Sequence, residues 1–75
     1  MPIDKQPLTE AAVININTAT AGDLEKLPHI GQQTAQKIVE YRERFGKFRK
    51  PEHLLLVRGI SVKKFQELKS LVAVE

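Results

Sequence analysis

One short pattern of residues occurs twice in the chain, and its residue types fit phosphate binding. Residues 27–38 align without a gap on residues 57–68. In each copy a tight step precedes an isoleucine, a small residue and a run with helical periodicity. The small residues, Gly31 and Ser61, stand where a helix N-cap is preferred. Free amides at the start of a helix, beside basic side chains, bind phosphate. Two such sites on one small domain suggest binding to the phosphates of two backbone strands.

The same residue types do not fit catalysis or metal binding. His29 has no nucleophile or orienting carboxylate at a usable spacing, so we interpret it as a turn residue, with a phosphate contact as the alternative. The chain has no cysteine, and His29 and His53 alone cannot complete a zinc site. We therefore predict no catalytic residue, no metal ligand and no enzyme activity.

Basic residues are concentrated in one segment of the chain. The net charge is +3, yet residues 42–64 hold eight Lys and Arg residues against only Glu43 and Glu52. Such a segment on a nearly neutral body is the electrostatic footprint expected for binding a polyanion. A solvated face of unpaired basic residues is the alternative interpretation.

A single small domain must position both copies of the pattern. With 75 residues, 41% of them hydrophobic and 28% charged, the chain suffices for one globular core near the lower size limit. We find no apolar run of transmembrane length and no signal-peptide segment near Met1. Residues 1–12 contain prolines and no periodicity, so we predict a flexible segment there and a folded domain over residues 13–75.

Apolar periodicity and stop signals predict an all-α domain of four or five short helices with no convincing strand. The expected helices cover residues 21–26, 32–45, 51–58 and 62–71. An extended piece over residues 13–16 precedes them. Because the pattern is repeated, we expect two equivalent helix pairs, related by pseudo-two-fold symmetry about the connector formed by residues 46–50.

Polar residues are expected to cap these helices, and periodic apolar residues to form the core. Thr20 and Asp23 fit a capping box, Asn15 and Asn17 are also expected to cap the first helix, and Gly46 to end the second. The aromatic residues of the second half are too few and too helically spaced for a base-stacking platform, so we assign them to the core. The predicted core residues are Leu24, Leu27, Ala35, Ile38, Val39, Tyr41, Phe45, Phe48, Leu54, Leu55, Phe65, Leu68 and Val72.

A series of spaced motifs resembles the helix-hairpin-helix domain of ComEA-type competence DNA receptors. The motifs lie at residues 14–19, 27–31 and 41–48, and the match continues through residues 54–60. The resemblance implies a tandem helix-hairpin-helix fold, similar to a SAM domain. It also implies sequence-independent binding of double-stranded DNA through hairpin amides at the minor groove. Similar tandem domains occur in Tex-type transcription accessory proteins and in DNA repair enzymes, so the biological setting stays open.

Under this resemblance, the phosphate contacts come from hairpin one (residues 27–31), hairpin two (residues 57–61) and the helix start after each. Contacts of this kind fix position without reading bases, so no sequence preference is expected. The predicted DNA-contacting residues are Ile30, Gly31, Gln33, Thr34, Lys37, Arg58, Gly59, Ile60, Ser61, Lys63 and Lys64.

Two hairpin positions depart from the glycines of the family pattern. His29 replaces the first glycine of hairpin one, and Ser61 replaces the second glycine of hairpin two. If position 29 requires a positive φ, a residue other than glycine costs about 1 kcal/mol there, and the imidazole obstructs a phosphate. The Ser61 hydroxyl can instead cap the helix or bind phosphate. We therefore expect hairpin two to contribute more to binding.

The resemblance also implies partners, cofactors and location. Double-stranded DNA is the expected partner of a monomeric chain, with no small-molecule substrate and no membrane contact by this chain itself. No cofactor is expected, apart from a monovalent cation that hairpin carbonyls hold in some family members. A periplasmic or cell-surface location is implied. The alternative is a protein-interaction domain of the same fold that has lost DNA binding.

Overall fold

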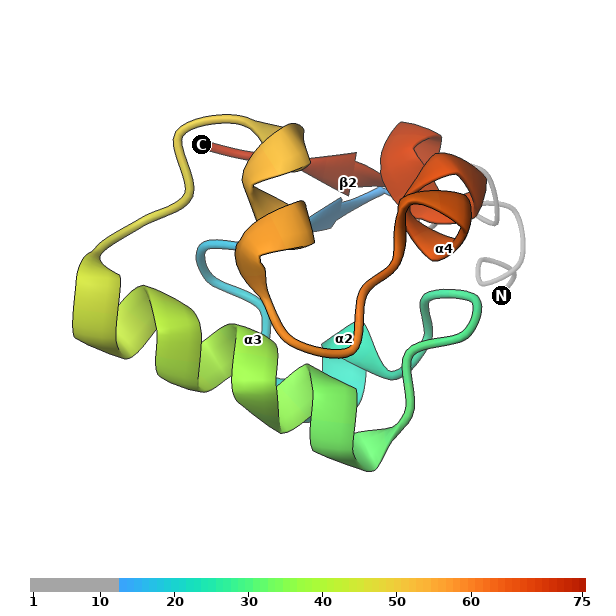
Figure 1. The fold of residues 1–75 in the computed structure, drawn as a ribbon. Coiled ribbons are helices and arrows are strands. Elements are labelled where there is room, and N and C mark those ends of the chain that lie inside the picture. The colour runs from blue at the N-terminus through green and yellow to red at the C-terminus, as the bar shows by residue number, and fades with distance from the viewer. Residues whose placement is uncertain (1–12) are drawn as a thin grey trace, which may run out of the picture.

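A computed structural model describes residues 13–75; the segment 1–12, predicted to be flexible, lies outside the described residues. Short helices joined by tight turns make up the described part (Figure 1), which confirms the all-α prediction. In chain order the elements are strand β1 (Ile14–Asn15), helices α2 (Ala21–Leu24) and α3 (Gln32–Phe45), 3-10 helix η2 (Pro51–Leu56), helix α4 (Val62–Leu68), 3-10 helix η3 (Lys69–Leu71) and strand β2 (Val72–Ala73).

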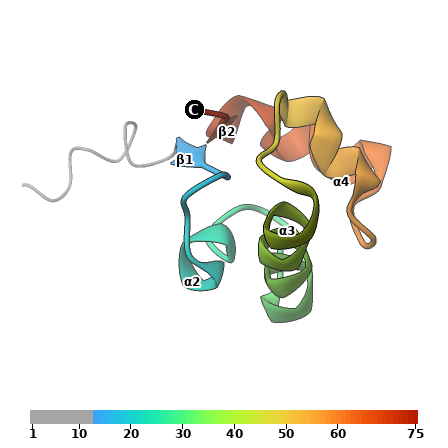
Figure 2. The ribbon, with the colours of Figure 1, turned by 90° about the vertical axis from the view of Figure 1, so that its left-hand side faces the viewer.

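Two helix–hairpin–helix units pack against each other. Helices α2 and α3 with hairpin one form the first unit, and η2 and α4 with hairpin two form the second. Figure 2 shows the first unit below the second, with the two strands at one edge. The connector of residues 46–50 leads from the end of α3 to the start of η2, as the repeat predicts. The units differ in length, because α3 has 14 residues and α4 has 7.

The prediction that the domain has no strand was wrong: the extended piece expected over residues 13–16 contains strand β1, and strand β2 at the other end of the domain was not expected. Strands β1 and β2 pair in parallel, with Ile14 opposite Val72 and Asn15 opposite Ala73. The N–H of Ile16 also donates to the carbonyl of Ala73 at 3.0 Å. Strands of two residues show no period in the sequence, and their partners are distant along the chain. The pairing ties the start of the domain to its end (Figure 1).

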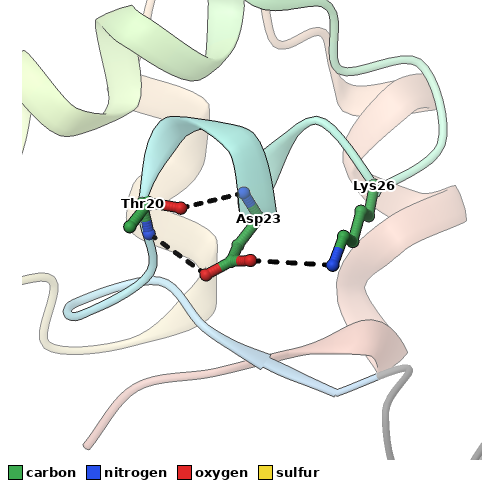
Figure 3. A network of polar contacts seen from close by, with 3 residues as sticks. All are labelled: Thr20, Asp23 and Lys26. Atoms are coloured by element: carbon green, nitrogen blue, oxygen red, sulfur yellow. Dashed lines mark hydrogen bonds and ion pairs between the residues drawn. The ribbon is translucent and has the colours of Figure 1, made fainter. Parts of the chain in front are cut away.

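Helix α2 begins with the predicted capping box (Figure 3). The Oγ1 of Thr20 accepts from the N–H of Asp23 at 3.1 Å, and the Oδ2 of Asp23 accepts from the N–H of Thr20 at 3.4 Å. The Nζ of Lys26 lies 3.7 Å from the Oδ1 of Asp23 in an exposed ion pair. The helix ends at Leu24 rather than at residue 26, because the N–H groups of Lys26 and Leu27 bond three residues back instead of four.

Asn15 and Asn17 do not cap α2, which corrects the sequence prediction. The N–H of Phe48 donates to the Oδ1 of Asn17 at 2.7 Å, and the Nδ2 of Asn17 donates to the carbonyl of Phe48 at 3.0 Å. The Oδ1 of Asn15 accepts from the N–H of Asn17 at 3.0 Å and from the N–H of Glu75 at 3.4 Å. These side chains therefore hold the connector and the chain end against the turn that follows β1.

Among the predicted core residues only Phe45 and Leu55 are exposed, and the core also contains residues that were not predicted to belong to it: Ile16, Ala19, Ile30, Val57 and Ile60. Leu54 in η2 and Val57, the residue that caps its end, both face the core three positions apart, because a 3-10 helix repeats every three residues. Phe48 is 2% exposed and confirms its role as the anchor of the connector. Val39 and Tyr41 pack at the edge of the core. The buried residues are Ile16, Ala19, Leu24, Leu27, Ile30, Ala35, Ile38, Phe48, Leu54, Val57, Ile60, Phe65, Leu68 and Val72.

Candidate functional site

The two hairpins have the same turn geometry. In hairpin one the N–H of Ile30 donates to the carbonyl of Leu27 at 3.2 Å, and in hairpin two the N–H of Ile60 donates to the carbonyl of Val57 at 3.2 Å. The residue before each isoleucine has a positive φ, of 65° at His29 and 103° at Gly59. Position 29 therefore has the positive φ at which a residue other than glycine is strained.

Ile30 and Ile60 anchor the hairpins rather than present groups to a ligand. Their side chains are buried in the core, and their N–H groups are used inside the turns. Neither residue has a free amide, so the prediction that they contact DNA is not supported through their N–H groups. Their burial fixes how far each hairpin projects from the domain.

The helix starts after the hairpins carry open amides. Gly31 is the N-cap of α3, in extended backbone and without a side-chain cap. In residues 13–75 no hydrogen bond involves the N–H of Gly31, Gln33 or Thr34. At α4 the Oγ of Ser61 accepts from the N–H of Lys64 at 3.2 Å, which confirms the predicted cap. That bond leaves one fewer open amide at hairpin two.

Contacts across the two units bring the hairpins onto one surface. A Cβ on Gly59 would lie 3.2 Å from the Oγ1 of Thr34, so hairpin two touches the first turn of α3. On the other side, the Nε2 of His29 lies 2.5 Å from the Oε1 of Glu67, so the tip of hairpin one touches α4. Each hairpin thus lies against the helix that follows the other.

Basic side chains surround this surface in unequal numbers. Lys37, Arg58 and Lys63 are exposed, and Lys37 and Arg58 line one groove between α3 and the second unit. Lys64 is half-buried, and its Nζ donates to the carbonyl of Gly59 at 3.4 Å, within its own hairpin. Hairpin two therefore has more positive charge beside it than hairpin one.

The structure divides the basic segment of residues 42–64 between two places. Arg58, Lys63 and Lys64 lie at hairpin two, whereas Lys47 lies beyond the far end of α3. Arg42 has a structural contact, since its Nη1 donates to the carbonyl of Ile16 at 2.8 Å. Only part of the predicted electrostatic footprint is therefore near the hairpins.

Glu67 is the residue at this site that sequence reasoning missed. In the alignment of the two copies it stands opposite Lys37, so one helix offers a cation where the other offers a carboxylate. The difference in sign at equivalent positions was the available signal. Glu67 pairs with His29 and places a negative charge beside hairpin one.

Two further observations concern residues 13–75. They contain no group of three or more His, Cys, Asp or Glu side chains that could hold a metal ion. No helix among them has the length and apolar character needed to cross a bilayer.

Comparison with known proteins identifies relatives in bacteria and in vertebrates. ComE operon protein 1 of Bacillus subtilis is 38% identical over 66 residues, which is 88% of this chain and 32% of the relative. Endonuclease/exonuclease/phosphatase family domain-containing protein 1 of Xenopus laevis is 48% identical over 61 residues, 81% of this chain and 11% of the relative. An uncharacterized protein of Haemophilus influenzae is 47% identical over 55 residues, 72% of this chain and 49% of the relative.

The chain spans between about a tenth and about a half of these relatives, so their names describe much longer proteins. A family model described as the helix-hairpin-helix motif matches residues 9–73, nearly the whole chain. Together with the ComE relative, this match confirms the resemblance to ComEA-type domains. The chain belongs to the helix-hairpin-helix family.

Proposed function

We propose that this domain binds double-stranded DNA without sequence preference. The observation that supports the proposal best is the pair of equivalent hairpin turns on one surface, each lying against the helix that follows the other and each followed by a helix start with open amides. Amides at a helix start bind phosphate because their N–H groups and the helix dipole both favour an anion. Two such groups on one surface suit the two phosphate backbones that border a groove.

Each hairpin has a distinct role in this proposal. At hairpin one the amides of Gly31, Gln33 and Thr34 hold a phosphate, with Lys37 beside them. At hairpin two the amides of Ser61 and Lys63 do so. The side chains of Arg58 and Lys63 supply positive charge there, which attracts the DNA backbone without reading its bases.

Hairpin two is proposed to dominate binding, for two reasons. The His29–Glu67 pair places an imidazole and a carboxylate at the tip of hairpin one, and a carboxylate repels phosphate. The Nζ of Lys64 lies at the carbonyl of Gly59, so hairpin two already holds a positive charge of its own at that carbonyl. It is at such hairpin carbonyls that the family resemblance implies a monovalent cation.

The biological role proposed is DNA uptake, with the domain acting as a monomeric, non-catalytic module at the cell surface. The similarity to ComE operon protein 1 supports this setting. The relatives named for an endonuclease/exonuclease/phosphatase family share only 11% of their length with this chain. We therefore assign the domain no enzymatic step.

Charge reversal at hairpin two tests the proposal. The double variant Arg58→Glu/Lys63→Glu should bind a random-sequence duplex about tenfold more weakly or worse, because phosphate contacts set the affinity. Both side chains are exposed and have no hydrogen bond within residues 13–75, so the helical content should be unchanged. Lys64 is left intact because it bonds to its own hairpin.

The matched control is Lys47→Glu/Lys50→Glu, which changes the net charge equally at the connector. These exposed lysines lie beyond the opposite end of α3 from hairpin one, about 20 Å away along a helix of 14 residues, and before the end of η2 that is remote from hairpin two. Gel-shift titrations at one low salt concentration compare the variants. If both double variants weaken binding equally, net charge alone acts. If the hairpin variant binds as the unchanged chain does, the protein-interaction alternative is the better one.

A further inference from the structure

A groove between α3 and η2 extends beyond the residues of the hairpin contacts. It has a volume of about 390 Å³. Its lining combines aliphatic, aromatic and basic side chains and one carboxylate, Glu40. The side chains that matter here are Lys37, Tyr41, Arg44, Phe45, Leu56 and Arg58.

An exposed aromatic ring stands at the far end of this groove. The rings of Phe48, Tyr41 and Phe45 follow one another, with centroids 5.2 Å apart for the first pair and 4.7 Å apart for the second. Phe48 is buried, whereas Phe45 is 67% exposed, so the series ends in a ring open to solvent. Leu56, 63% exposed, lines the same groove. A small domain with this much apolar surface in one place offers a contact for a ligand.

The charges in the groove favour an anionic ligand. Lys37, Arg44 and Arg58 outnumber Glu40. An anion with flat apolar faces meets both the cations and the exposed ring. Nucleic acid has this combination, since phosphates alternate with bases that stack on aromatic side chains.

The groove is continuous with the proposed DNA surface. Lys37 and Arg58 belong to both. Helix α3 runs from hairpin one beneath η2 (Figure 1) and ends at Phe45. Phe45 lies eight residues after Lys37, about 12 Å along the helix axis. That length corresponds to about three to four base pairs of rise. A strand leaving the hairpins along α3 therefore reaches Phe45 within a few nucleotides.

We propose that this groove takes a single-stranded segment that adjoins the duplex held by the hairpins, with one unpaired base stacked on Phe45. Inside a duplex each base is paired and stacked between its neighbours, so it has no free face for the ring, whereas an unpaired base has one. The domain then prefers a junction between duplex and single strand to an uninterrupted duplex. The inference rests on the proposed binding of duplex DNA and specifies the form of DNA preferred.

The experiment compares blunt duplex with the same duplex carrying a four-nucleotide single-stranded tail, at the 3′ end or at the 5′ end. At equal salt the unchanged chain should bind one tailed form about fivefold tighter or more, the lower end of what one stacked base contributes. Phe45→Ala should remove that preference and leave the affinity for blunt duplex unchanged. Phe45→Trp, which keeps a ring, should retain it.

Val13→Ala is the control variant, because Val13 is also an exposed apolar residue but lines a different pocket, beside β1. It should behave as the unchanged chain does. Equal affinity for blunt and tailed duplex, or a tail preference that survives Phe45→Ala, overturns the inference and leaves the groove to a protein partner. If the unchanged chain does not bind blunt duplex at all, the result is a different one, since it overturns the proposed function itself.

Discussion

His29 and Gly59 occupy the same turn position in the two hairpins, with different side chains. Both have a positive φ, which glycine adopts freely and other residues adopt at a cost of about 1–2 kcal/mol. The contact between His29 and Glu67 does not offset much of this cost, because both side chains are about half exposed and exposed ion pairs contribute little. The strain in hairpin one is therefore held mainly by the burial of Leu27 and Ile30 on either side.

Gly59→Ala should destabilise the domain by about 1–2 kcal/mol, because alanine must adopt the positive φ of this turn. The new Cβ would also lie 3.2 Å from the Oγ1 of Thr34, closer than ordinary contact. For a domain of this size, each kcal/mol lowers Tm by about 4–8 °C. Thermal unfolding followed by circular dichroism measures the change.

Gly31→Ser is the control for that variant. Position 31 has a negative φ and open space around a Cβ, and its counterpart in hairpin two is already Ser61, which caps α4. The substitution should leave Tm unchanged or raise it slightly, since serine is as good an N-cap as glycine or better. If both variants lower Tm by the same amount, the positive φ at Gly59 is not the cause of the destabilisation.

At the scale of the elements, local signals predicted most of the fold. The bounds of α3 and the start of α4 follow from the small N-cap residues and from Gly46, and all are observed as predicted. The strands and the contacts of Asn17 were not predictable, because they join residues 31 to 58 positions apart in the chain. The exposure of Leu55 depends on η2 being a 3-10 helix, which an apolar run alone does not distinguish from an α-helix.

Asn17→Ala should cost the domain about 1–3 kcal/mol. The variant removes the acceptor for the N–H of Phe48 and the donor to its carbonyl, and groups left unsatisfied near the core carry their full desolvation cost. The connector would lose its attachment to the β1 turn. Thr18→Ala is the control, since Thr18 is an exposed neighbour in the same turn. Urea unfolding of both variants gives the comparison, and equal midpoints would contradict the role assigned to Asn17.

At the scale of the whole molecule, the proposed DNA binding depends more on where the charged side chains lie than on how many there are. The sequence shows where the basic residues stand along the chain, and its repeated pattern predicts the two hairpins. It does not show that Arg42 is tied to Ile16, nor that hairpin one faces Glu67, because both contacts form only when the two units pack together. The exposure of Phe45 has the same origin, since α3 extends beyond the second unit before the chain turns at Gly46.

The salt dependence of DNA affinity tests how many cations meet phosphates. If Lys37, Arg58 and Lys63 all do so, log affinity should fall against log salt concentration with a slope of about −2.7, from about −0.9 per phosphate contact. The same slope should hold for two unrelated duplexes, and the dissociation constants should lie at roughly 10⁻⁴ to 10⁻⁶ M.

Lys63→Ala should flatten the slope by about 0.9. Lys47→Ala should leave it unchanged, because that side chain lies past the far end of α3. Fluorescence anisotropy titrations across a salt series measure all three slopes, and equal slopes for the two variants would remove hairpin two from the contact surface.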